Sequence, residues 1–127
     1  MTKNADLAYR ALDTALANPL HLEMRSWFEP ADDRQQVVTI DDLIRPGCGT
    51  TACFAGWAIA LAGYGLTQAD KVVSLADGAV VGDDIADFAA DLLGVDMSEA
   101  HTLFFNREAL LPKAVAKVFG PRPEMKA

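Results

Sequence analysis

The feature that most constrains this chain is a long stretch without a charged residue, which runs from Pro46 to Ala69 between Arg45 and Asp70. Its length alone is compatible with a helix that crosses a membrane. Its apolar part, residues 52–66, is however only 15 residues long and contains three glycines, whereas a membrane span needs about 20 predominantly apolar residues. We therefore expect no membrane partner, and we expect this stretch to form the central helix of a soluble domain.

Length and composition favour one cytoplasmic domain. A chain of 127 residues with 51% hydrophobic residues can bury one core, so we expect a single domain over residues 1–127 with a loose tail at 120–127. The beginning of the sequence lacks the apolar region of a signal peptide, and two cysteines are too few for a secreted disulfide framework. A net charge of −7 and 8% aromatic residues argue against direct binding of nucleic acid, which requires a surplus of cations.

Hydrophobic periodicity and capping residues predict an α+β fold that is mostly helical, with a small β-hairpin or sheet. Two β-branched runs around Asp77-Gly78 predict a hairpin over residues 71–82. Residues 37–40 are β-prone, and residues 20–28 suit a strand or an extended segment. The helices are expected at residues 4–17, 52–62, 84–93, 112–119 and from Ser98 to about Phe105, with a helical turn at 41–44.

The most distinctive part of the chain is the twelve-residue motif GCGTTACFAGWA, which begins at Gly47. Its threonines are expected to cap the helix 52–62. On that helix Ala52, Gly56 and Ala60 form a groove without long side chains. A glycine inside a helix costs about 1 kcal/mol relative to alanine, so Gly56 indicates a close neighbour, either another core element or a ligand or partner. The residues singled out in this motif are Cys48, Gly49, Thr50, Thr51, Cys53, Gly56 and Trp57.

This motif resembles the CGTTACxAGWA-type signature of a family of small proteins of actinobacteria and their bacteriophages. In that family a Met-x-x-Trp-like segment often precedes the signature, as Met24-Arg25-Ser26-Trp27 does here. A Leu-Leu-Gly segment and an Ala-x-x-Leu-Phe segment follow, similar to Leu92-Leu93-Gly94 and Ala100-His101-Thr102-Leu103-Phe104. The resemblance covers about residues 18–111. It implies a cytoplasmic accessory protein of phage type and no particular reaction.

Several chemical roles of Cys48 and Cys53 stay open at this point. A thiol near a helix N-terminus has a lowered pKa and suits a nucleophile, which would make the chain a small enzyme or ligand-binding protein built on the Cys48–Cys53 connector. With His21 and His101 the two cysteines would form a zinc site, and with each other a disulfide. Buried thiols that pack as small hydrophobic groups are the favoured interpretation, so we assign no catalytic residue, no metal ligand and no cofactor.

The acidic residues are concentrated in one segment. Residues 70–99 contain eight acidic side chains and one base, Lys71, so this segment carries the whole net charge of the chain. Such a face either keeps the protein soluble or docks a basic partner. We expect a non-enzymatic protein that binds a macromolecular partner, a protein of unknown identity, through this acidic face or through the small-residue groove. The residues expected to contact the partner are Asp83, Asp84, Asp87 and Asp91, around the start and on the outer face of the helix 84–93.

Overall fold

The computed structural model describes residues 3–24, 28–29, 37–45, 50–67, 71–105, 107 and 110–122. The helices are α1 (Ala5–Ala17), the 3₁₀ turn η1 (Pro19–His21), α2 (Ile40–Ile44), α3 (Phe54–Leu61), α4 (Ile85–Leu93), α5 (Met97–Phe104) and α6 (Leu111–Phe119). The strands are β1 (Phe28–Glu29), β2 (Val37–Val38), β3 (Thr51–Ala52), β4 (Tyr64–Thr67), β5 (Val72–Ser74) and β6 (Val80–Gly82). This set confirms the predicted α+β fold in which helices predominate.

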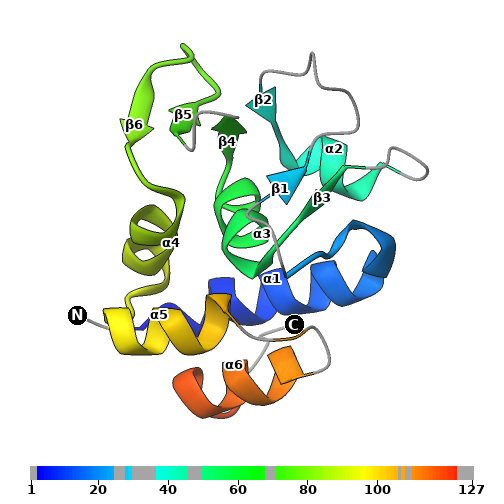
Figure 1. The fold of residues 1–127 in the computed structure, drawn as a ribbon, viewed down its shortest axis with the longest axis vertical. Coiled ribbons are helices and arrows are strands. Elements are labelled where there is room, and N and C mark those ends of the chain that lie inside the picture. The colour runs from blue at the N-terminus through cyan, green and yellow to red at the C-terminus, as the bar shows by residue number, and fades with distance from the viewer. Residues whose placement is uncertain are drawn as a thin grey trace.

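Helix α3 lies at the centre of the molecule, with the larger sheet on one side and α1, α5 and α6 on the other (Figure 1). Every residue from Phe54 to Ala60 is buried, which is why the helix is apolar on all sides. The long uncharged stretch thus becomes an eight-residue helix followed by β4. In the part of the chain that the structure describes, no helix combines the length and the apolar character needed to cross a bilayer.

The larger sheet is antiparallel and has the strand order β2-β4-β5-β6. Strands β5 and β6 form the predicted hairpin, and its turn contains Gly78 with a φ of +73°, a conformation that favours glycine. The side chains of Val38, Leu66 and Val72 are fully buried in the same core as α3. Burying each of them contributes about 1.5–3 kcal/mol, which fixes the sheet against the helix.

The N-terminal half of the signature differs from the prediction. Helix α3 begins at Phe54, and its N-cap residue is Cys53 rather than Thr50 or Thr51. Residues 51–52 form β3 instead, because they pair with β1 and because the Ala52 carbonyl accepts a hydrogen bond from the backbone N–H of Glu23 at 3.0 Å. Pairing with a distant segment has therefore overridden the local capping preference.

Two further boundaries differ in detail. Helix α5 begins at Met97 rather than at Ser98, because Asp96 and Glu99 form a capping box. In this box the side chain of each residue accepts a hydrogen bond from the backbone N–H of the other. The start of the segment predicted as a loose tail is held against α1, where Arg122 forms an ion pair with Asp13. Residues 123–127 lie outside the described residues.

Candidate functional site

The described part of the signature, residues 50–58, points into the core. Trp57 is fully buried, and its indole Nε1 donates a hydrogen bond to the backbone carbonyl of His21 at 3.1 Å. The buried His21 ring in turn donates through Nδ1 to the carbonyl of Thr50 at 2.6 Å. The backbone N–H of Phe54 lies 3.4 Å from the sulfur of Met24. His21 and Met24 therefore cover the N-terminal end of α3.

Cys53 is a free thiol with 1% of its surface exposed. Burial raises the pKa of Cys53 from 9.0 to about 11, and the nearby backbone N–H groups of Gly56 and Ala55 oppose this effect only in part. The nucleophile alternative required the helix N-terminus to lower this pKa, but desolvation outweighs that effect. A thiol that stays protonated at neutral pH is a poor nucleophile, so the structure supports the packing role of Cys53.

The threonine at position 51, the residues at 48–49 and the small-residue groove also belong to the motif. Thr51 lies half-buried in β3, and its hydroxyl oxygen is buried without a hydrogen-bond partner among the described residues. The expectations for Cys48 and Gly49 fall outside the described residues. The predicted small-residue groove is closed, because Ala52 lies in β3 and is buried, as are Gly56 and Ala60 on α3. It offers no exposed surface to a partner.

The two histidines do not join Cys53 in a metal site. His21 is buried beside the signature, whereas His101 is exposed on α5 with its ring centroid 5.0 Å from that of Phe105. Over the described ranges of the chain, no group of three or more His, Cys, Asp or Glu side chains is placed to hold a metal ion.

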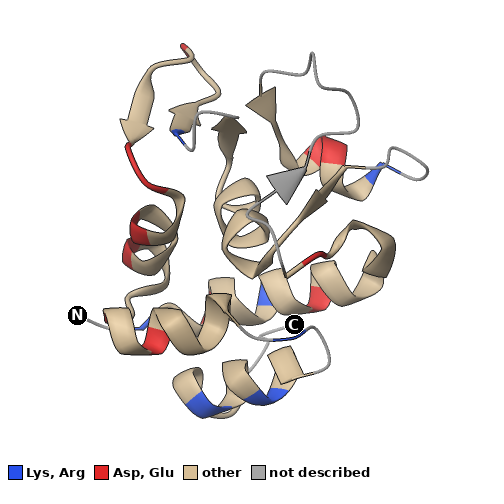
Figure 2. Cartoon of the chain, viewed as in Figure 1, with Lys and Arg blue, Asp and Glu red and all other residues tan. Residues whose placement is uncertain are grey.

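The four aspartates expected to contact a partner are exposed, as predicted, and they surround one hollow. This hollow has a volume of about 190 Å³ and is lined by residues of β6, of α4 and of the segment that joins them. The acidic residues between β6 and α4 and on α4 are red in Figure 2. We call the residues that line the hollow the acidic surface. They are Val81, Gly82, Asp83, Asp84, Asp87, Phe88 and Asp91.

Local geometry fixes the acidic surface. Asp84 is the N-cap residue of α4, and its Oδ1 accepts a hydrogen bond from the backbone N–H of Asp87 at 2.9 Å. The ring of Phe88 packs edge-on against Tyr64 of β4, with ring centroids 5.0 Å apart. A Cβ atom at Gly82 would lie 2.6 Å from Cδ2 of Phe88, so only glycine lets this ring approach β6. Phe88 is therefore half-buried between β6 and β4.

The acidic surface has little compensating positive charge. Lys71 places its Nζ 3.5 Å from Oδ1 of Asp83, and both side chains are well exposed, so this pair adds little stability. Asp84, Asp87 and Asp91 have no ion-pair partner in the described part of the chain. A partner that brings cations to Asp84, Asp87 and Asp91 would therefore not have to displace an ion pair among the described residues.

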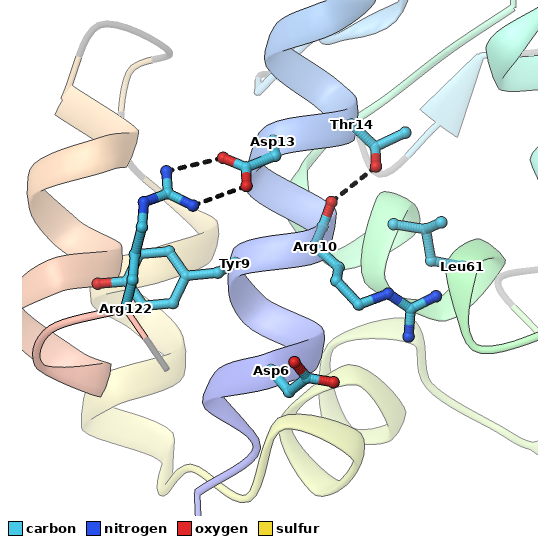
Figure 3. A pocket seen from close by; sticks show the side chains of 7 residues that line it. All are labelled: Asp6, Tyr9, Arg10, Asp13, Thr14, Leu61 and Arg122. Atoms are coloured by element: carbon cyan, nitrogen blue, oxygen red, sulfur yellow. Dashed lines mark hydrogen bonds and ion pairs between the residues drawn. The ribbon is translucent and has the colours of Figure 1, made fainter. Parts of the chain in front are cut away.

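A second hollow, of about 390 Å³, lies between α1, the end of α3 and the C-terminal segment (Figure 3). The Arg122 guanidinium binds both carboxylate oxygens of Asp13, at 2.6 and 2.7 Å, and lies 4.8 Å from the centre of the Tyr9 ring. This contact lowers the pKa of Asp13. The residues that line this hollow are Asp6, Tyr9, Arg10, Asp13, Thr14, Leu61 and Arg122. Two of these side chains are acidic and two are basic, so the lining has no net charge that would select a charged partner.

This second hollow was not expected from the sequence. The sequence pattern that points to it is the polar face of α1, where Asp6, Arg10 and Asp13 lie on one side of the helix. The C-terminal residue that completes the hollow is distant in sequence and could not be placed from a pattern.

Comparisons of this chain with protein-family models, with curated proteins and with solved structures find no match. Function is therefore inferred from the geometry of the acidic surface.

Proposed function

We propose that this chain is a non-enzymatic, cytoplasmic accessory protein of phage type that binds a basic protein through its acidic surface. The observation that supports this proposal is the gathering of four exposed aspartates around one hollow that also contains Val81 and Phe88. Exposed charges of one sign steer an oppositely charged partner and speed its association. The apolar side chains provide area that a partner can bury after the encounter.

The sign of the charge selects the class of partner. A nucleic acid carries a phosphate at every nucleotide and would be repelled by this surface and by the net charge of −7. A protein segment rich in lysine or arginine would be attracted. The partner class is therefore a basic protein.

The alternative, a small enzyme or ligand-binding protein built on the Cys48–Cys53 connector, loses support at Cys53. That thiol is buried, and its pKa is raised to about 11. The N-terminal end of α3 is likewise covered by protein, since Phe54 and Ala55 are fully buried.

The test is capture from a host lysate by the immobilised protein at low and at high salt. The variant Asp87→Asn/Asp91→Asn removes two charges from the acidic surface and leaves the N-cap residue Asp84 in place. The control Asp6→Asn/Asp41→Asn removes two exposed charges from α1 and α2. We expect wild type and control to retain the same basic protein at low salt and the test variant to lose most of it.

A result against the proposal is equally concrete. If the test variant retains the same proteins as wild type at every salt concentration, the acidic surface serves only solubility, and the docking role is withdrawn.

A further inference from the structure

Strand β6 is the outer edge of the larger sheet. It pairs with β5 and ends the strand order β2-β4-β5-β6, so none of the other described strands pairs with its outer side (Figure 1). Val80 and Val81 are 56% and 47% exposed, unlike the buried valines of β5. An edge strand presents unpaired backbone N–H and C=O groups, onto which another extended chain can add.

Carboxylates lie at both ends of this edge. Asp77 is in the turn that precedes β6, and its Oδ1 accepts a hydrogen bond from the backbone N–H of Ala79 at 3.0 Å. Asp83 follows β6 directly, and the remaining aspartates of the acidic surface continue along α4 (Figure 2). The side chain of Val81 lines the same hollow as these aspartates. The strand edge and the acidic surface are therefore one continuous face.

We propose that a basic segment of the partner binds in extended form along β6, adding a strand to the sheet while its cations contact Asp87 and Asp91. In such a segment alternate side chains point to opposite faces. Lysine or arginine side chains on the face towards the hollow would reach its carboxylates, and apolar side chains on the other face would cover the exposed Val80. This inference rests on the proposed function and adds to it the conformation of the partner and the place where it binds.

A second copy of this chain does not fit the same edge. Pairing β6 with β6 would bring two sets of aspartates together, and like charges in an interface oppose association. Charge complementarity therefore assigns the edge to a basic segment of a different protein.

The experiment uses the full chain, isotopically labelled, and a seven-residue peptide of alternating lysine and valine as the probe. A matched peptide carries proline in place of the central valine, which keeps the charge but removes the donor and the extended pairing. Amide hydrogen exchange is measured residue by residue, and affinity is measured by titration at low ionic strength. The variant Asp87→Asn/Asp91→Asn and the control Asp6→Asn/Asp41→Asn are titrated in parallel.

We expect the lysine–valine peptide to slow exchange at one or more amides of residues 80–82 at least tenfold, and the proline peptide to lose this protection. We expect the test variant to bind the peptide about three- to tenfold more weakly than the control, the range for two exposed charge pairs. Strand addition is overturned if binding depends on Asp87 and Asp91 but leaves the amide exchange of residues 80–82 unchanged. It is also overturned if the proline peptide gives the same binding and protection. Either result leaves the proposed function standing. Equal affinity of the test and control variants overturns both.

Discussion

Replacing Trp57 by phenylalanine tests whether the signature is part of the core. The indole Nε1 donates to the carbonyl of His21 at 3.1 Å in a region where Trp57 is 0% and His21 6% exposed. Leaving a buried carbonyl without its donor costs about 1–3 kcal/mol, and the smaller ring loses roughly 1 kcal/mol of packing. We therefore expect Trp57→Phe to lower the free energy of unfolding by about 2–4 kcal/mol. A domain with a typical stability of about 5–15 kcal/mol would remain folded.

The assay is urea unfolding followed by far-UV circular dichroism, because this signal does not depend on the tryptophan that is removed. The midpoint should fall by about 1–2 M with an unchanged slope. Phe105→Leu serves as the control, since Phe105 is 63% exposed and its substitution should change the free energy of unfolding by less than about 0.5 kcal/mol. If Trp57→Phe lowers that free energy by less than the control does, the signature is not a stabilising part of the core and must be reconsidered as a site.

Further predictions concern Cys53, Asp13 and Gly82. Cys53 should resist a thiol reagent in the native protein and react after denaturation. Because folding raises its pKa from 9.0 to about 11, the stability that depends on the protonated thiol is fully present below pH 9 and is lost as the pH rises towards 11. Wild type should therefore lose about 2 kcal/mol more than Cys53→Ala over this range, and parallel pH–stability curves would refute the buried thiol. The ion pair with Arg122 lowers the pKa of Asp13, so its contribution is present above about pH 4 and is lost as Asp13 is protonated. Asp13→Asn should therefore lower the melting temperature slightly at pH 7, and this difference from wild type should shrink as the pH falls below 4. Gly82→Ala should destabilise the fold by about 1–3 kcal/mol, because the new methyl group displaces the Phe88 ring; an unchanged unfolding midpoint would show that the ring moves freely.

Elements with strong local signals could be predicted from the sequence. Helix α4 has Asp84 as its N-cap residue and ends at Gly94 in the left-handed conformation. Both signals are local, because the capping side chain and the glycine each act on backbone groups only a few residues away. The hairpin around Gly78 has the same local origin. The exposure of Asp87 and Asp91 followed from their positions on the polar face of the helix.

Elements that depend on distant partners could not be predicted. Strand β3 replaces a helical start because it pairs with β1, and β4 follows α3 because it pairs with β2 and β5. Neither strand alternates polar and apolar residues clearly enough to be seen in the sequence. The lowered pKa that the nucleophile alternative required of Cys53 is not found, because burial in the folded core raises that pKa.

The claim that the acidic surface recognises a basic partner is tested most directly by association kinetics. The measurement is the association rate constant of the captured partner with wild type, Asp87→Asn/Asp91→Asn and Asp6→Asn/Asp41→Asn over a range of ionic strength. Because exposed charges act mainly by steering, we predict that the first variant associates at least about threefold more slowly at low salt and that its rate depends less on salt. The Asp6→Asn/Asp41→Asn control should match wild type. Rates that fall on one common line for all three proteins would contradict the account.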